Sequence, residues 1–221
     1  IPEGRITTLI GANGSGKSTL FNLLTKNLKP TGGTVHLRGG DVTDLRLRDF
    51  ARLVAIVHQR NSAPGDLAVE KLVGYGRFPY HGMGSAANTE EDERMVAWAL
   101  EVTGLTEYAK RPVSALSGGQ AQRLTLARTL AHPRPVLVLD DPFSALDRAT
   151  EDAVFANLKA YARDKVVFLI SHRLYHFREM QKIVFMEDGK AIVGTHEELL
   201  ARSAAYRALY ESQTGGDEHE A

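Results

Sequence analysis

Residues 5–27 read RITTLIGANGSGKSTLFNLLTKN, and this stretch sets the architecture expected for the whole chain. Residues 5–10 are apolar and β-branched, so they predict a buried strand that stops at Gly11. Residues 17–27 place leucines and a phenylalanine at helical spacing, and Pro30 follows this predicted helix. The intervening loop, GANGSGKS, fits G-x-x-x-x-G-K-[ST], a pattern that cradles phosphate groups with backbone N–H groups.

Residue types assign roles within this phosphate loop. Its glycines let the backbone curl around the phosphates, and the N-terminus of the following helix adds partial positive charge. Lys17 should reach the β- and γ-phosphates, and the Ser18 hydroxyl should ligate Mg²⁺. The candidate nucleotide-binding residues are Gly11, Asn13, Gly14, Ser15, Gly16, Lys17, Ser18 and Thr19.

Strands and helices alternate along the rest of the chain. Further buried strands are expected at residues 53–58, 135–139 and 165–170, and helices at residues 89–103, 119–131 and 148–162. The strand at 135–139 shows no polar alternation, so both of its faces should be covered, as in a central parallel strand. Asp188-Gly189 predicts a type I′ hairpin between residues 182–186 and 190–193. The predicted fold class is therefore α/β with a mostly parallel sheet.

The helix expected at residues 89–103 carries a clear start signal. Thr89 and Asp92 have the spacing of a capping box, and acidic residues fill the first turn. We expect the charged run at residues 90–94 to be a capped, solvated helix start.

Two carboxylates, Asp140 and Asp141, directly follow the apolar run PVLVL at residues 135–139. Asp140, at the end of the predicted strand, is the natural holder of Mg²⁺ or of its water shell. An apolar strand that ends in aspartate is common, but together with the phosphate loop it predicts a P-loop nucleoside triphosphatase. That class still includes kinases, GTPases and helicases.

The sequence LSGGQ at residues 116–120, followed by AQR, narrows the class. Here the chain resembles the signature motif of the ATP-binding cassette family, and the order and spacing of its motifs match that family over nearly the whole chain. Gln59 ends AIVHQ and resembles the Q-loop glutamine. Asp147 ends SALD and resembles the D-loop aspartate, and His172 in SHR resembles the switch histidine.

The resemblance implies a P-loop core at about residues 1–60 and 132–212, with an inserted helical subdomain at about 61–131 that carries the signature motif. Residues 214–221 are expected to be a disordered tail. The signature glycines before a helix form a second anion nest, and one chain has no reason to cradle the same phosphate twice. The resemblance implies that Ser117, Gly118, Gly119 and Gln120 serve the nucleotide of a second cassette, so that two ATP molecules lie at a dimer interface.

The implied chemistry needs ATP and Mg²⁺. By resemblance, Gln59 contacts Mg²⁺ and the attacking water and relays the nucleotide state to a transport partner, and His172 holds the γ-phosphate and that water. The implied catalytic residues are Asp141, His172 and Gln59, and the implied metal-site residues are Ser18, Gln59 and Asp140.

Asp141 departs from the family pattern, which usually has glutamate at this position. Aspartate keeps the charge but is one methylene shorter, and a displacement of roughly 1 Å at a reacting centre can cost about 10²-fold in rate. We therefore expect ATP binding with slow hydrolysis, as in the degenerate member of an asymmetric pair. The alternative is that a small backbone shift restores the geometry and a homodimer works normally.

Two further features bear on the assignment to a branch of the family. The chain begins at Ile1 rather than Met, so we expect that the natural N-terminus, with the strand and the adenine-stacking aromatic residue usual in the family, is missing. Residues 28–131 resemble the ATPase subunits of iron-siderophore and cobalamin importers. Residues 165–212 resemble exporter-type cassettes fused to a membrane domain, so both transport directions stay open.

The amino-acid composition limits the classes of partner that this chain can have. Lysine plus arginine number 27 and aspartate plus glutamate number 27, so no bulk field favours nucleic acid. The absence of cysteine excludes a disulfide scaffold and a thiolate zinc site. No apolar run approaches the roughly 18 residues of a membrane span. The resemblance therefore implies a peripheral subunit at the cytoplasmic face of a membrane, with transmembrane transporter subunits as partners.

Two other functions fit the sequence less well. A soluble cassette ATPase of DNA repair or translation would carry a long coiled coil or a second cassette with a charged linker, and neither is in this sequence. A P-loop small-molecule kinase would leave the signature motif unexplained.

Overall fold

The computed structural model describes residues 1–57, 66–80, 89–173 and 176–214. The strands in these ranges are β1 (Arg5–Gly11), β2 (His36–Leu37), β3 (Gly40–Asp41), β4 (Val54–Val57), β5 (Val136–Asp140), β6 (Val166–Ile170), β7 (Lys182–Glu187) and β8 (Lys190–Gly194). The α-helices are α1 (Lys17–Leu24), α2 (Leu47–Leu53), α3 (Val69–Gly74), α4 (Glu90–Val102), α5 (Gly118–Leu130), α6 (Arg148–Tyr161), α7 (His196–Arg202) and α8 (Ala204–Thr214). Short 3₁₀ turns are η1 (Val42–Asp44), η2 (Tyr75–Tyr80), η3 (Thr106–Tyr108), η4 (Val113–Ala115), η5 (Ala162–Asp164) and η6 (Phe177–Glu179).

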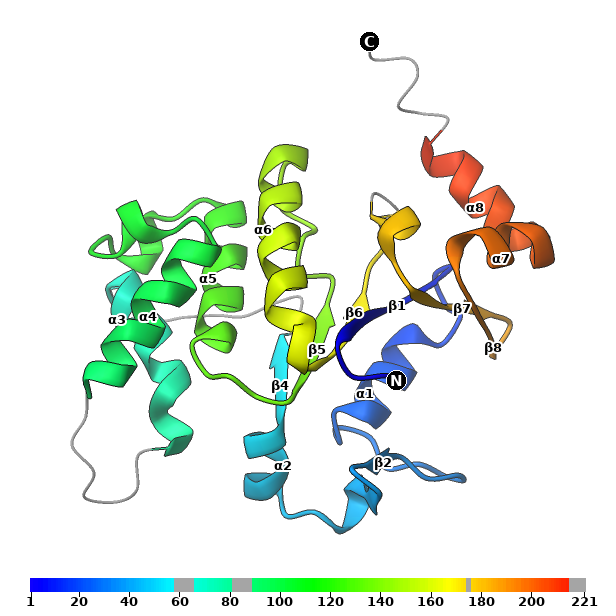
Figure 1. Cartoon of the computed structure of the whole chain (residues 1–221), viewed down its shortest axis with the longest axis horizontal. Coiled ribbons are helices and arrows are strands. Elements are labelled where there is room, and N and C mark those ends of the chain that lie inside the picture. The colour runs from blue at the N-terminus through cyan, green and yellow to red at the C-terminus, as the bar shows by residue number, and fades with distance from the viewer. Residues whose placement is uncertain (58–65, 81–88, 174–175, 215–221) are drawn as a thin grey trace.

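The main sheet has the strand order β4-β5-β6-β1-β7-β8, with parallel pairing from β4 to β7 and an antiparallel β8 (Figure 1). This confirms the α/β class and makes β5 an interior strand, next to the edge strand β4, with a parallel neighbour on each side. Asp140 lies opposite Ile170, which in turn lies opposite Leu9. The loops that follow β5, β6 and β1 therefore leave the sheet side by side at its carboxyl edge, where open α/β sheets bind ligands.

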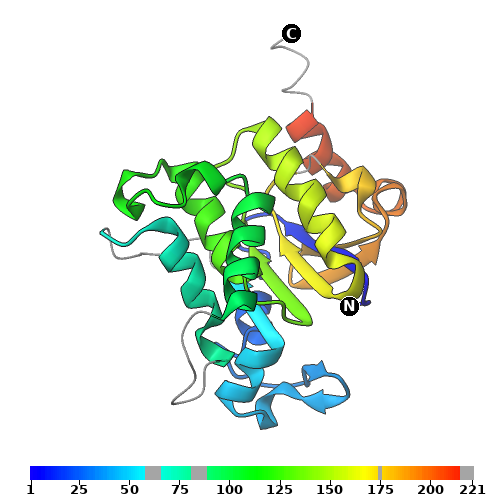
Figure 2. The same cartoon turned by 60° about the vertical axis from the view of Figure 1, so that its left-hand side comes forward.

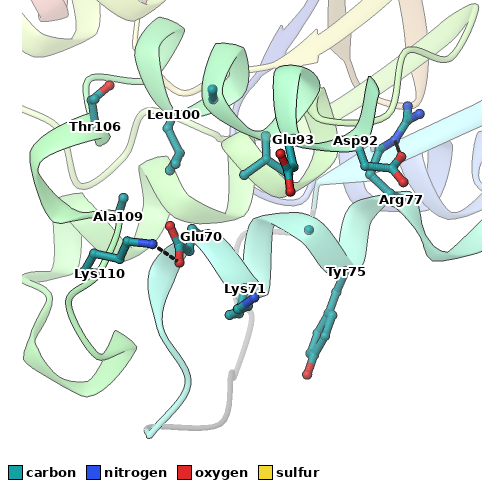
Figure 3. A pocket seen from close by; sticks show the side chains of 13 residues that line it. Glu70, Lys71, Tyr75, Arg77, Asp92, Glu93, Leu100, Thr106, Ala109 and Lys110 are labelled. Carbon is teal, nitrogen blue, oxygen red and sulfur yellow. Dashed lines mark hydrogen bonds and ion pairs between the residues drawn. The ribbon is translucent and has the colours of Figure 1, made fainter. Parts of the chain in front are cut away.

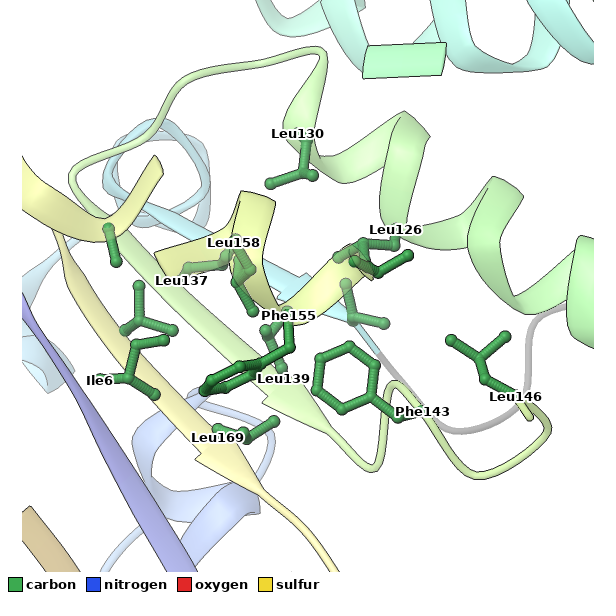
Figure 4. Close-up of a cluster of buried hydrophobic side chains, with 14 of the residues drawn as sticks. Ile6, Leu126, Leu130, Leu137, Leu139, Phe143, Leu146, Phe155, Leu158 and Leu169 are labelled. Carbon is green, nitrogen blue, oxygen red and sulfur yellow. The ribbon is translucent and has the colours of Figure 1, made fainter. Parts of the chain in front are cut away.

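Hydrophobic side chains cover both faces of the sheet, because successive strand residues point to opposite sides. On one face, Leu139 and Leu169 pack with Phe155 of α6 and with residues of α5, as Figure 4 shows. On the other face, Val138 and Ile170 pack with side chains of α1 and α2. The near-continuous apolar pattern of β5 is thus explained by burial on both sides.

Helices α3, α4 and α5 pack against one another beside the β4 edge of the sheet (Figures 1 and 2). The predicted capping box is present, because Thr89 accepts from the Asp92 backbone and the Asp92 carboxylate accepts from the Thr89 backbone. However, Asp92 is buried rather than solvated, since its carboxylate lies 2.5 Å from the Arg77 guanidinium. The division into core and helical subdomain at residues 61 and 131 stays a prediction.

Several element ends differ from the expectations. Helix α1 ends at Leu24 rather than at residue 27, because Lys26 adopts a left-handed φ of 61° and its ammonium donates to the carbonyls of Val42, Thr43 and Leu45. Asp188 and Gly189 both have positive φ, which confirms the type I′ turn.

The expected disordered tail began at residue 214, but Thr214 is the last residue of α8, where its hydroxyl donates to the Tyr210 carbonyl. The rest of that prediction, residues 215–221, lies outside the described residues. None of the helices in the described ranges is long and apolar enough to span a bilayer.

Candidate active site

The phosphate loop curls between β1 and α1 as its sequence predicts. Gly14 and Gly16 have φ values of 81° and 101°, which glycine adopts readily and other residues do not. Gly11 is required for a different reason, since a Cβ there would lie 2.3 Å from the Met186 carbonyl oxygen. The shape of the loop therefore depends on the backbone freedom of Gly14 and Gly16 and on the close packing of Gly11.

Lys17, the first residue of α1, is buried with its ammonium inside the loop. Its Nζ donates to the carbonyls of Gly11 (2.7 Å) and Ala12 (2.8 Å). Burial lowers the pKa of Lys17, and the negative charge of Asp140 opposes this shift. Strand β6 separates β5 from β1, yet Asp140 and Lys17 act on each other electrostatically.

The loop fits a phosphate group. Within the described part of the chain, the buried Ser15 hydroxyl has no hydrogen-bond partner, and a buried polar atom of this kind calls for a ligand. The Ser18 and Thr19 side chains are exposed at the start of α1, where the helix dipole favours anions. Ser18 and Asp140 offer hard oxygen atoms, the donor type that Mg²⁺ prefers.

Asp141 has an unusual backbone. Its φ is 46°, a left-handed conformation that aspartate tolerates better than most residues because its short side chain can hydrogen-bond locally. Its N–H donates to the Ile170 carbonyl (2.9 Å), which ties it to the end of β6. The side chain is buried, and burial raises the pKa of its carboxyl, while His172 and Arg173 on the next loop oppose that shift.

Of the remaining predicted residues, one follows a strand, one caps a helix and one lies outside the described residues. His172 follows β6 by two residues, so it leaves the sheet beside Asp141, and its side chain is exposed. Asp147 caps α6 by accepting from the backbone (2.9 Å) and the hydroxyl (2.8 Å) of Thr150. Gln59 lies outside the described residues.

The signature motif forms the start of α5. Ser117 and Gln120 cap each other in a reciprocal box, with distances of 3.3 Å and 2.9 Å between backbone nitrogen and side-chain oxygen. Gly119 packs against the segment before α6, because a Cβ there would lie 2.8 Å from the Ala145 carbonyl oxygen. Around Gly118, in contrast, a Cβ would meet nothing within 4 Å in the described chain.

Sequence reasoning missed two side chains that hold residues 141–147. Gln122 of α5 donates to the Asp141 carbonyl (2.8 Å) and accepts from the Ala145 N–H (2.7 Å). Arg173 donates to the carbonyls of Ser144 (2.8 Å) and Leu146 (2.9 Å). In the sequence, Gln122 lies beside the signature motif and Arg173 lies beside His172. No local sequence pattern indicates which backbone groups their side chains contact.

The helical layer contains a groove of about 600 Å³. Its walls come from α3, α4 and the segment that follows η3, and they include the apolar residues Val96, Leu100 and Ala109. Two ion pairs line it as well. Lys110 lies 2.7 Å from Glu70, and Arg77 binds Asp92 (Figure 3).

Comparison with known proteins assigns the family. The model of the family described as "ABC transporter" matches residues 1–144. The chain belongs to this family. The iron(3+)-hydroxamate import ATP-binding protein FhuC of Bacillus subtilis is 41% identical over 178 residues, which are 80% of this chain and 66% of that protein. The ATP-dependent lipid A-core flippase of Ralstonia nicotianae is 36% identical over 225 residues, 96% of this chain and 36% of the flippase.

Solved structures agree with this assignment. A bacterial Atm1-family ABC exporter with ATP bound matches with a TM-score of 0.84 and 25% identity, over 96% of this chain and 37% of that one. An inward-facing putative metal-chelate type ABC transporter matches with a TM-score of 0.76 and 28% identity, over 96% of this chain and 79% of that one. Both kinds of relative predicted for the two halves of the chain are therefore present among the matches. The chain spans about two thirds of the importer relative's length and about a third of the flippase's.

Proposed function

We propose that this chain binds Mg-ATP at its phosphate loop and hydrolyses it as the motor of an ABC transporter, working as a dimer of cassettes. The proposal rests on two helix starts, those of α1 and α5, which are suited to bind anions through their backbone N–H groups. At the start of α1 the Lys17 ammonium is bound by carbonyls of its own loop, whereas at the start of α5 a Cβ on Gly118 would meet nothing within 4 Å among the described residues. A glycine without an internal packing reason suits the close approach of a ligand from outside the chain.

In this proposal each residue has a defined task. Backbone N–H groups of the phosphate loop and Lys17 hold the β- and γ-phosphates, and Ser18 and Asp140 hold Mg²⁺, with Gln59 as a further ligand. When bound, the metal neutralises charge that develops on the phosphate oxygens. Asp141 orients or deprotonates the attacking water, and His172 holds that water and the γ-phosphate. Ser117, Gly118, Gly119 and Gln120 contact the nucleotide held by the second cassette.

Hydrolysis at this site is slow in our proposal, because Asp141 is shorter than glutamate and its left-handed backbone fixes where the carboxylate starts. ATP binding closes the dimer, and hydrolysis followed by product release opens it. The second cassette is either another copy or a partner that carries the glutamate.

The groove between α3 and α4 is the proposed contact with the transmembrane subunits, which places the chain at the cytoplasmic face of the membrane. Its apolar lining residues and the Lys110–Glu70 ion pair at its edge suit a segment of a partner protein. Importer activity of the siderophore type is supported by the resemblance of residues 28–131. The alternative is an exporter, which is supported by the resemblance of residues 165–212 to exporter-type cassettes.

Nucleotide binding tests the proposal directly. We expect Lys17→Ala to weaken binding of a fluorescent ATP analogue in the presence of Mg²⁺ by about 10-fold or more, the scale for loss of a charged hydrogen-bond donor. Lys190→Ala, an exposed position on β8, is the matched control and should bind as the wild type does. Equal affinity of the wild type and Lys17→Ala would overturn the proposed site.

A further inference from the structure

The Arg173 guanidinium bridges two loops that leave the sheet from different strands. Arg173 lies on the loop after β6, one residue beyond His172. Its two terminal nitrogens reach the segment between β5 and α6, where Nη2 donates to the Ser144 carbonyl (2.8 Å) and Nη1 to the Leu146 carbonyl (2.9 Å). The planar fork of arginine suits two acceptors held at a fixed spacing.

A buried carboxylate fixes the orientation of this fork. Glu151, in the first turn of α6, is 2% exposed, and its Oε2 lies 3.2 Å from Arg173 Nη1. Glu151 is therefore oriented by the helix that Asp147 caps. The loop of Arg173 is also closed on itself, since the Ser171 hydroxyl accepts from the Arg173 N–H and donates to its carbonyl, both at 3.1 Å.

Gln122 holds the same segment from the side of α5. Its amide donates to the Asp141 carbonyl and to the Ser144 hydroxyl (2.9 Å), and it accepts from the Ala145 N–H. The segment 141–147 is thus gripped by one side chain from the signature helix and one from the loop of His172. Because Gln122 and Arg173 contact interleaved positions of this segment, the segment cannot move without breaking hydrogen bonds to at least one of them.

We propose that Arg173 is a positioning residue that locks the loop of His172 to the segment 144–147, so that His172, Asp141 and Asp147 keep one relative arrangement during ATP hydrolysis. This inference rests on the proposed function, because it concerns the geometry of that same site. Arg173 acts through backbone carbonyls, and its tasks are to hold two loops in register and to neutralise Glu151.

Steady-state kinetics distinguish a loss of positioning, which lowers kcat, from a loss of ATP binding, which raises KM. We expect Arg173→Met to lower kcat for ATP by about 10-fold or more while KM stays within about 2-fold, because a small displacement at the reacting centre costs rate rather than affinity. Arg173→Lys keeps the charge but offers a single point donor, so it should show a similar loss. Full kcat in Arg173→Lys, or a raised KM with unchanged kcat in Arg173→Met, would overturn the proposal.

Folding and the proposed function are controlled separately. Arg173→Met removes the arginine that is ion-paired with the buried Glu151, while His176 stays 3.9 Å from that carboxylate. The double variant Arg173→Met/Glu151→Gln, which also removes the carboxylate charge, should therefore fold and still show the low kcat. Arg178→Met, an exposed arginine bound to the Tyr210 hydroxyl, is the matched control and should behave as the wild type does.

Hydrogen–deuterium exchange gives a readout independent of activity. We expect amides of residues 144–147 to exchange about 10-fold faster in the double variant than in the wild type, with α5 unaffected, because the two carbonyl anchors are lost. Unchanged exchange there would overturn the role of Arg173. A wild type that hydrolyses no ATP would instead overturn the proposed function, and the exchange result would still decide the inference.

Discussion

Gly118 and Gly119 stand side by side at the start of α5, yet the packing of this chain explains only one of them. A side chain at Gly119 would collide with the Ala145 carbonyl, whereas a Cβ at Gly118 would meet nothing within 4 Å in the part of the chain that the structure describes. Neither has a positive φ, so backbone conformation does not require glycine at either position. Gly119 is a packing glycine, and Gly118 is the one that suits a ligand from another molecule.

This difference predicts opposite effects of the same substitution. Gly118→Ala should leave the free energy of unfolding unchanged or raise it by up to about 1 kcal/mol, since alanine favours the helix, and should lower ATP turnover about 10-fold. Gly119→Ala should cost about 1–3 kcal/mol of stability through overpacking. Urea denaturation and steady-state turnover check both variants. Wild-type turnover in Gly118→Ala would contradict the role of this glycine.

The backbone of Asp141 limits which residues can replace it. At a φ of 46°, asparagine is as acceptable as aspartate, whereas glutamate lacks the short side chain that stabilises the left-handed region. Asp141→Asn is therefore the cleanest variant for removing the charge without disturbing the loop. Asp141→Glu should fold with a loss of about 1 kcal/mol.

At the scale of elements, the connection from α5 to β5 contains a buried titratable group. His132 is 1% exposed, and burial, with help from Arg134 and Arg77, lowers its pKa from 6.5 to about 3. The folded chain therefore keeps His132 neutral, while the unfolded chain protonates it below about pH 6.5. Its contribution to stability is complete above that pH and is lost progressively as the pH falls toward 3.

This linkage predicts a measurable pH dependence. Between pH 7.5 and pH 5, the free energy of unfolding should fall by about 2 kcal/mol on account of His132. His132→Gln, which cannot titrate, should remove that part of the slope. Urea denaturation of both proteins at the two pH values checks this. Parallel losses in wild type and variant would contradict it.

Elements that repeat a local pattern could be predicted from sequence, and contacts between distant segments could not. The loop between β1 and α1, the capping box at Thr89 and the type I′ turn are each encoded within a few residues, so their positions were predicted correctly. The early end of α1 depends on Lys26 reaching carbonyls that lie 16 to 19 residues away. Burial of Asp92 likewise depends on Arg77, which lies 15 residues before it.

The same limit applied to the candidate site. Asp140, Asp141 and His172 follow strands, so the topology of a parallel sheet was enough to bring them to one edge. The roles of Gln122 and Arg173 could not be predicted, because both side chains contact main-chain atoms of another loop, and such contacts leave no periodic signal in the sequence.

At the scale of the molecule, nucleotide chemistry and partner docking are proposed for different parts of the chain. The phosphate loop, Asp141 and His172 lie at the carboxyl edge of the sheet, and the groove lies between α3 and α4 of the helical layer (Figure 3). This separation predicts that transport can be removed without loss of basal hydrolysis.

Ala97→Trp, on the groove wall, tests that separation. It should leave basal ATP turnover of the purified chain within about 2-fold and lower uptake of ferric siderophore by cells about 10-fold, because the bulk of the indole excludes the partner segment. Ala160→Trp, exposed on α6, is the matched control. If Ala97→Trp cells take up siderophore as the wild type does, either the docking site or the importer assignment is wrong.

The most direct test of the proposed chemistry is steady-state hydrolysis of Mg-ATP by the wild type beside Asp141→Glu and Asp141→Asn. We predict that Asp141→Glu raises kcat about 10-fold or more, as expected when a misplaced base is corrected, and that Asp141→Asn falls below the wild type. Equal turnover in all three proteins would contradict the central claim that hydrolysis at this edge of the sheet is governed by the carboxylate at position 141.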